Sequence, residues 1–160
     1  MKLLLIVVGR PGRVLESAIA EYEARARRYW PLEVIEVKEE RARSGATDEQ
    51  IKNAEAERLL KRVPKGLELM ALTRTGDAWT SQRLARHIEH TAVEASAGIA
   101  FMIGGSLGLA DVVLRDAQRR MRLSTYTLPH DLARLILLEQ LYRAGTIVRG
   151  EPYHKGGDES

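Results

Sequence analysis

Apolar and polar positions along the chain follow two periods, one typical of strands and the other typical of helices. Short apolar or alternating runs predict strands at Leu3–Val8, Leu32–Val37, Leu67–Thr73, Gly98–Ile103 and Arg122–Tyr126. Apolar residues at helical spacing predict helices at Leu15–Trp30, Thr47–Arg62, Ser81–Ala95, Leu109–Arg120 and Pro129–Ile147. Because strands and helices alternate throughout, the sequence predicts one α/β domain with a mainly parallel sheet flanked by helices.

Local signals indicate where several of these elements begin. Thr47 and Gln50 stand three residues apart, as in a capping box, and open the second helix. A turn is predicted around Gly76, and Ser81 is predicted to cap the helix that follows it. Pro129 suits the first position of the last helix, where its missing N–H costs no hydrogen bond.

The composition is that of an ordinary soluble domain, since 44% of the 160 residues are apolar and 29% are charged. The net charge of +3 is compatible with a nucleic-acid partner, but the interspersed charges also fit a solvated surface. The absence of cysteine excludes disulfides and thiolate metal sites, and His87 and His90 fit a surface pair better than a metal site. The first apolar run ends at Arg10, too early for a signal peptide or a membrane span. We therefore expect a cytoplasmic protein without a metal.

The first candidate for chemistry is the segment IGGSLGL, residues 103–109. A strand that ends in Gly104 and Gly105 lets a ligand approach the backbone closely, and ligands gather at the carboxyl ends of strands in open α/β sheets. The segment matches neither the dinucleotide fingerprint nor the Walker loop, which argues against those ligands. A plain tight turn is the alternative interpretation.

The second candidate is LSTYTLPH, residues 123–130, where hydroxyl side chains precede a helix. Backbone groups in such a bend are suited to hydrogen bonding with an adenine edge or a carboxylate. The alternative is ordinary helix capping by Thr127. His130 stands at the helix N-terminus, where the helix dipole disfavours a protonated imidazole.

The last predicted helix is the third candidate, because its leucines and isoleucines occupy nearly every angle around the axis. A helix that is apolar on all sides must be covered on all sides, so a second subunit is one expected neighbour. Glu139 and Arg143 stand four residues apart within this apolar helix and are able to pair. They form either an internal ion pair or part of a site for a polar substrate.

Together and in this order, five segments resemble one known family. They are LTRTGDAW (72–79), IGGSLGL (103–109), LSTYTLPH (123–130), EQLYRA (139–144) and RGEPYHK (149–155). They are similar to the small SPOUT-class methyltransferases that methylate ring nitrogen N3 of a pseudouridine in bacterial large-subunit (23S) ribosomal RNA. The resemblance extends from Met1 to about Lys155. One departure is Leu107, where many members have an acidic or amide residue.

The resemblance implies a SPOUT-type fold with a C-terminal trefoil knot. It places a single methyltransferase domain at residues 1–155, a knot region at about 68–148 and a disordered tail at 156–160. It also implies a homodimer that acts on 23S rRNA within the ribosome and uses S-adenosylmethionine. By motif, the residues near this cofactor are Leu72, Gly104, Leu123, Ser124, Thr125, Tyr126, Thr127 and Leu128.

The candidate catalytic residues are His130, Glu139, Arg143, Tyr153 and His154, of which the resemblance implies that Tyr153 and His154 are ordered parts of the active site. In the family, the C-terminal tail lies near the cofactor of the other subunit. The candidates for removing the proton from the target nitrogen are His154, His130 and Glu139, and a water molecule or no base at all is the alternative. Arg143 suits a carbonyl oxygen or a phosphate, and Tyr153 suits stacking on a base. Phosphate contacts by basic residues of the first half are a further expectation, with a solvated surface as the alternative, for Arg10, Arg13, Arg25, Arg27 and Arg28.

Two other functions remain open at this point. A related SPOUT enzyme would methylate a ribose hydroxyl or another RNA base, although the terminal PYHK segment argues against it. A non-catalytic α/β dimer that binds RNA during ribosome assembly would not bind S-adenosylmethionine. Measuring the binding of that cofactor separates the enzymes from the binding protein.

Overall fold

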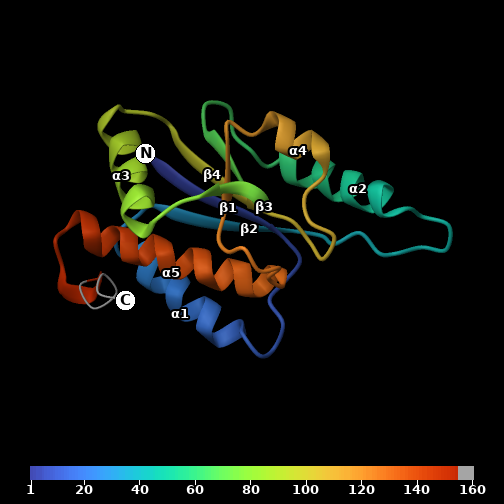
Figure 1. Cartoon of the computed structure of the whole chain (residues 1–160), viewed down its shortest axis with the longest axis horizontal. Coiled ribbons are helices and arrows are strands. Elements are labelled where there is room, and N and C mark those ends of the chain that lie inside the picture. Colours follow the sequence, from blue (N-terminus) through green and yellow to red (C-terminus); the bar gives the residue numbers. More distant parts are fainter. Residues whose placement is uncertain (155–160) are drawn as a thin grey trace.

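A parallel sheet organises the computed structural model, which describes residues 1–154 of the chain (Figure 1). Within these residues five strands pair in the order β2-β1-β4-β3-β5, and all pairs are parallel. The strands are β1 (Lys2–Val8), β2 (Leu32–Val37), β3 (Glu68–Ala78), β4 (Gly98–Ile103) and β5 (Arg119–Arg122). The predicted α/β class is therefore confirmed. Residues 155–160, and with them the tail predicted at 156–160, lie outside the described residues.

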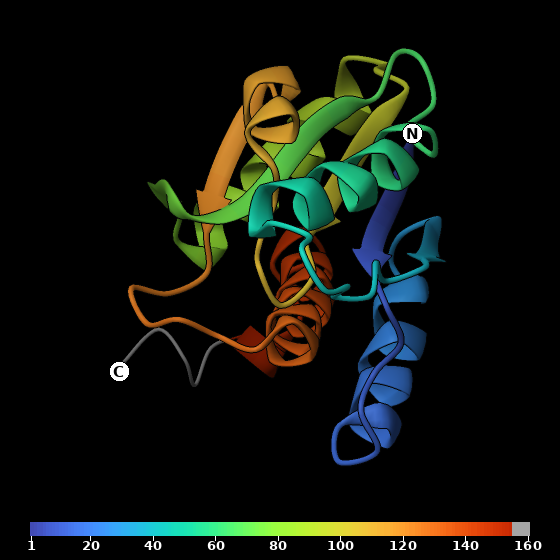
Figure 2. The same cartoon turned by 90° about the vertical axis from the view of Figure 1, so that its right-hand side faces the viewer.

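Helices cover both faces of the sheet, as Figures 1 and 2 show from two sides. They are α1 (Glu16–Arg27), α2 (Asp48–Leu60), α3 (Ser81–Val93), α4 (Asp111–Asp116) and α5 (His130–Val148), followed by the 3₁₀ helix η1 (Pro152–His154). Buried residues of α1, α3 and α5 share one hydrophobic core, and those of α2 and α4 share another on the opposite face. Each fully buried Leu, Ile or Phe in these cores contributes about 1.5–3 kcal/mol to folding.

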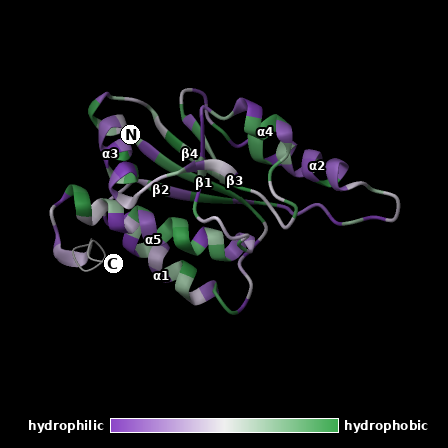
Figure 3. Ribbon diagram, viewed as in Figure 1, coloured by the Kyte–Doolittle hydropathy of each residue, from purple (hydrophilic) through white to green (hydrophobic). Residues whose placement is uncertain are grey.

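The apolar pattern places the central strands and α5 inside the protein (Figure 3). Every residue of β4 is buried, and so is every residue of β1 after Lys2. Along α5, each residue is buried or half-buried, since the helix lies between α1 and α3. Among the residues that the structure describes, no helix is long and apolar enough to span a membrane.

The turn predicted around Gly76 is wrong, because β3 continues through this position to Ala78. A Cβ atom at Gly76 would lie 2.7 Å from backbone atoms of Arg120 and Met121. Glycine at this position therefore allows the backbone of β5 to approach β3 closely. The pairing of the two strands shifts register between Leu72 and Asp77, so the extra residues form an irregular extension rather than a turn.

The prediction for the segment before the last helix is also partly wrong. The short strand spans Arg119–Arg122 and not Arg122–Tyr126, and α4 is only six residues long. The backbone N–H of Gln118 donates to Leu69 on β3, which ends the helical stretch and begins strand pairing. Pairing with β3 here outweighs the local preference for helix.

The predicted N-terminal cap is confirmed for α2 but is wrong for α3. Thr47 and Gln50 form the predicted capping box at the start of α2, with reciprocal backbone bonds of 3.0 and 3.1 Å. At α3, however, Thr80 is the cap, because its hydroxyl accepts from the backbone N–H of Arg83. Ser81 instead donates its hydroxyl to the side chain of Gln140 on α5 at 2.6 Å.

Candidate cofactor pocket and tail cluster

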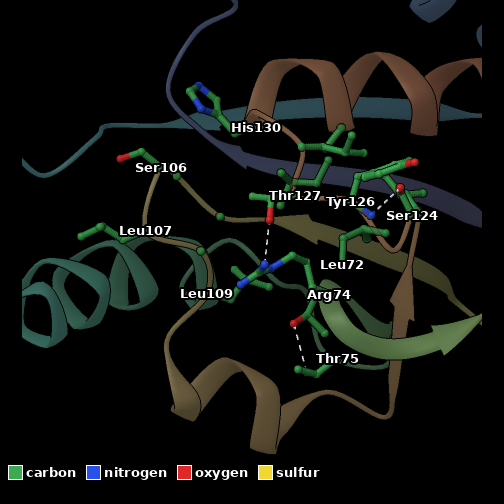
Figure 4. Close-up of a pocket in the computed structure, with 18 residues that line it drawn as sticks. Leu72, Arg74, Thr75, Ser106, Leu107, Leu109, Ser124, Tyr126, Thr127 and His130 are labelled. Atoms are coloured by element: carbon green, nitrogen blue, oxygen red, sulfur yellow. Dashed lines mark hydrogen bonds between the residues drawn. The ribbon is translucent and has the colours of Figure 1, made fainter.

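A cavity of about 310 Å³ opens at the carboxyl ends of β3 and β4 (Figure 4). Three segments line it: residues 72–75 of β3, the loop 103–109 after β4, and parts of 123–133, which connect β5 to α5. This is the position where ligands bind in open parallel sheets. The two loops that the sequence singled out therefore meet in one pocket.

Most of the residues expected near a cofactor line this cavity. They are Leu72, Gly104, Leu123, Ser124, Tyr126, Thr127 and Leu128. Thr125 is exposed in the same loop and does not line the cavity. Of the residues expected to be catalytic, His130 also lines it. The sequence prediction missed Arg74 and Thr75, because a turn was expected where β3 continues.

Gly104 is required by the shape of the first loop. A Cβ atom at this position would lie 2.6 Å from the carbonyl carbon and oxygen of Gly108. The loop closes by a 3.0 Å hydrogen bond from the N–H of Gly108 to the carbonyl oxygen of Gly105, and Gly108 has a positive φ of 83°. The tight turn proposed as an alternative is thus present, and it forms one wall of the cavity.

The second loop is held by its own hydroxyl groups. The backbone N–H of Tyr126 donates to the hydroxyl of Ser124 at 2.9 Å, and the hydroxyl of Thr127 accepts from the guanidinium of Arg74 at 2.7 Å (Figure 4). The expected capping role of Thr127 is wrong. Pro129 was expected as the first residue of the last helix, but α5 begins at His130 and Pro129 is its N-cap. No side chain caps this end of the helix.

Glu139, Arg143 and Tyr153 form a second cluster, which we call the tail cluster. The guanidinium of Arg143 donates twice to one oxygen of Glu139, at 3.0 and 2.7 Å, so the predicted ion pair is confirmed. The hydroxyl of Tyr153 donates to the same oxygen at 3.1 Å, and the amide of Gln140 donates to the other at 2.7 Å. Burial, with the Glu139 carboxylate nearby, raises the pKa of Tyr153, so its hydroxyl stays protonated.

Aromatic contacts hold the tail against α5. The ring of Tyr153 lies 4.6 Å from that of Tyr142 between centroids, with the Arg143 guanidinium 5.0 Å from the Tyr153 ring. Tyr29 donates a hydrogen bond to Glu151, which fixes the chain just before η1. The side chain of His154 lies outside the described part of the chain.

The tail cluster and the cavity lie at different positions along α5. His130 is the first residue of this helix, and Arg143 follows 13 residues later. At a rise of about 1.5 Å per residue, the two positions are separated by roughly 20 Å along the axis. One chain therefore brings Glu139, Arg143 and Tyr153 together but does not bring them to the cavity.

The family is decided by comparison with known sequences. A family described as predicted SPOUT methyltransferase has a sequence model that matches residues 1–154. The chain belongs to the SPOUT methyltransferase family. Its predicted family membership is thereby confirmed.

Relatives of this SPOUT methyltransferase align over nearly their full lengths. The protein named ribosomal RNA large subunit methyltransferase H from Gemmatimonas aurantiaca is 47% identical over 97% of this chain and 100% of its own. Proteins of the same name from Syntrophotalea carbinolica and Acetivibrio thermocellus are 44% and 42% identical, over 96% and 97% of this chain and 99% and 100% of theirs.

Among solved structures, a probable methyltransferase from Bordetella pertussis Tohama I superposes with a TM-score of 0.54. It covers 90% of this SPOUT methyltransferase and 94% of its own chain. With 14% identity, this likeness supports the shared fold alone.

In this SPOUT methyltransferase, a buried carboxylate lies beneath the glycine turn. Glu55 on α2 is 4% exposed, and a Cβ atom at Gly105 would lie 3.1 and 3.2 Å from its two carboxylate oxygens. One of those oxygens accepts a 3.1 Å hydrogen bond from the backbone N–H of Glu40. Glu55 thereby connects the loop after β2 to the wall of the cavity, and larger side chains at Gly105 would collide with it.

We expect Glu55 to stabilise the fold less as the pH rises. Burial, with Glu39 and Glu40 nearby, raises the pKa of Glu55 in the fold. A raised pKa means that the stabilising contribution is fully present below the pKa of the unfolded chain and is lost as the pH rises through the folded pKa. The Glu55→Gln variant of this SPOUT methyltransferase should therefore gain stability relative to the wild type between about pH 4 and pH 8.

Urea unfolding at both pH values measures this difference. Glu57→Gln, which removes an exposed carboxylate from the same helix, is the control. A stability difference between Glu55→Gln and the wild type that is constant across the range, or that changes in the opposite direction, contradicts the prediction.

The other candidate residues of this SPOUT methyltransferase lie apart from the cavity or are paired. Arg25 and Arg27 form ion pairs with glutamates one turn earlier on α1. His87 bonds to Glu68 at 2.6 Å. Within residues 1–154, no group of three or more potential metal ligands is found.

Proposed function

We propose that this SPOUT methyltransferase transfers the methyl group of S-adenosylmethionine to ring nitrogen N3 of a pseudouridine in 23S rRNA within the ribosome. The observation that carries the proposal is the alignment with proteins named ribosomal RNA large subunit methyltransferase H over nearly the full length of both chains. The proposal includes one domain at residues 1–155 and a trefoil knot at about 68–148.

The lining of the cavity fits S-adenosylmethionine. Its volume of about 310 Å³ falls within the range of small-molecule sites. Apolar side chains such as Leu72, Ile103 and Leu123 suit an adenine ring, while the hydroxyls of Ser124 and Thr127 suit its polar groups. We assign the binding of the cofactor to Leu72, Gly104 and the loop 123–128. When bound, the cofactor supplies an electrophilic methyl group on its sulfonium.

The residues of the chain must position the target base and remove the proton from its N3. Positioning lowers the barrier of such a reaction by about 7–11 kcal/mol in favourable cases, and a general base accelerates it by about 10²–10⁴-fold. His130 lines the cavity and has a side chain suited to proton transfer near neutral pH. Glu139 accepts hydrogen bonds from Arg143, Gln140 and Tyr153, so its role is to hold them in position. His154 remains a second candidate base.

We further propose that the enzyme is a homodimer whose active sites are shared. Leu107 and Tyr126 at the cavity rim are 38% and 79% exposed, which suits cover by a partner subunit. Leu132 and Ile136 on α5 are half-buried without belonging to either core. The roughly 20 Å between cavity and tail cluster along α5 would then be bridged by the tail cluster of the other subunit.

The test is methylation of ribosomes from a strain that lacks this gene. Purified protein, labelled S-adenosylmethionine and those ribosomes are incubated, and the 23S rRNA is digested and mapped by mass spectrometry. We expect one additional methyl group on a pseudouridine base. A methyl group on a ribose or on another base would support a related SPOUT activity. If calorimetry detects no cofactor binding, the non-catalytic RNA-binding function replaces the proposal.

A further inference from the structure

Two hollows that share lining residues lie between the cofactor cavity and α3, along the outer part of β3. The cavity shares Thr75 with a hollow of about 370 Å³, and this hollow shares Trp79 and Arg119 with another of about 540 Å³ against α3. We call these two hollows the β3–α3 groove. Its lining includes Thr75, Trp79, Arg83, Arg86, Arg119 and Arg120.

Arginines outnumber acidic residues in this groove, since four arginines line it together with Asp77 and Glu89. All four of its arginines are exposed, and no lysine lines either hollow among the described residues. Arg119 pairs with Glu68 at 3.1 Å, whereas Arg86 and Arg120 have no ion-pair partner within residues 1–154. Unpaired guanidinium groups bind phosphate oxygens through two parallel hydrogen bonds. The groove therefore complements a chain of phosphates.

An aromatic side chain holds part of this charge in place. Trp79 is half-buried, and the guanidinium groups of Arg83 and Arg119 lie 4.2 and 5.8 Å from its ring centroid. The ring of His87 contacts it edge-on at 5.2 Å. Because stacking restricts the two arginines, binding an anion there costs less side-chain entropy.

We propose that the β3–α3 groove binds the sugar-phosphate backbone of the rRNA strand that leads to the target nucleotide. This inference rests on the proposed function, because it assumes that the target base enters the cavity. From Thr75 to Trp79 the extended chain spans about 13 Å, which leads the strand from the cavity to the arginines. A second protein subunit fits less well, since the cores of such interfaces are depleted in charge. Among the described residues of the lining, Val93 is the one exposed large apolar side chain.

The test compares two double charge reversals of equal size. Arg86→Glu with Arg120→Glu changes the groove, and Arg62→Glu with Lys65→Glu changes exposed residues outside its lining. The probe is large ribosomal subunits from a strain that lacks this gene. Binding is measured by co-sedimentation at several salt concentrations, together with methyl transfer, cofactor affinity by calorimetry and oligomeric state.

We expect the groove variant to lose at least about tenfold in affinity for the subunits and the control to lose less than about threefold. The slope of log affinity against log salt should become shallower by about 1.4–1.8 for the groove variant, as two phosphate contacts are lost. Its cofactor affinity should stay within about twofold of the wild type, because Arg86 and Arg120 do not line the cavity.

Equal losses in both variants would overturn the inference, as would unchanged binding by the groove variant or no binding by the wild type. A change of oligomeric state in the groove variant would assign the surface to a subunit interface instead. If the wild type binds the subunits but transfers no methyl group, the proposed function fails. Even in that case, comparing the two variants still shows whether the β3–α3 groove binds the ribosomal subunits.

Discussion

Replacing Gly104 with alanine is expected to weaken the binding of S-adenosylmethionine by about 10–100-fold. The added methyl group would lie 2.6 Å from the carbonyl carbon and oxygen of Gly108, and both contacts are with backbone. The loop must therefore shift, and overpacking of this kind costs about 1–3 kcal/mol. Because the loop forms one wall of the cavity, the shift alters the site itself. Titration calorimetry of the variant measures the change in affinity.

Gly45→Ala is the matched control for this substitution. It adds the same methyl group at a positive φ of 85°, where nothing lies within 4 Å of the new atom. The control should lose some stability through backbone strain and keep the cofactor affinity of the wild type. Wild-type affinity in a folded Gly104→Ala protein would show that the glycine turn does not shape the cofactor site.

Strands β2 and β4 were predictable because their apolar or alternating runs have clear limits. The predicted ranges Leu32–Val37 and Gly98–Ile103 agree with β2 and β4 at both ends. Each begins directly after a proline or at a glycine, and β4 is buried along its whole length. At these positions the local sequence pattern and the tertiary environment both favour a strand with the same limits.

Strands β3 and β5 were less predictable, because their limits depend on each other. The extension of β3 beyond Thr73 and the position of β5 both follow from the close approach at Gly76. Neither segment has an apolar run that fixes its ends. The error affected the site, since Arg74 and Thr75 line the cavity from the extension that was expected to turn.

The tail cluster was predictable only in part. The spacing of Glu139 and Arg143 predicts their ion pair from helix geometry alone. The position of Tyr153 depends on contacts with Tyr142 and on the bond between Tyr29 and Glu151, which join segments far apart in sequence. The two loops that line the cavity were predicted from residue patterns, whereas the individual cofactor-binding residues came from the family resemblance. Spacing along one chain contains no information about a site shared between two.

Mixed dimers are expected to decide whether each active site uses two subunits. Gly104→Ala damages the cavity, and Arg143→Ala damages the tail cluster. Alone, Arg143→Ala should lower kcat by about 100-fold, as the loss of one positioned donor does in other enzymes, and keep cofactor affinity within about twofold. A dimer of one chain of each kind, purified through two different tags, has one site with both parts intact if the parts come from different subunits.

This mixed dimer should therefore show about half of the wild-type methyl transfer to ribosomes, because one of two symmetric sites works. If cavity and tail cluster of the same chain formed the site, both sites would be damaged and almost no activity would remain.

The reverse arrangement is the control: a chain with both substitutions is paired with a wild-type chain. Shared sites then give almost no activity, whereas sites within one chain give about half. The two dimers contain the same substitutions, so a difference between them measures only which subunit supplies the tail cluster.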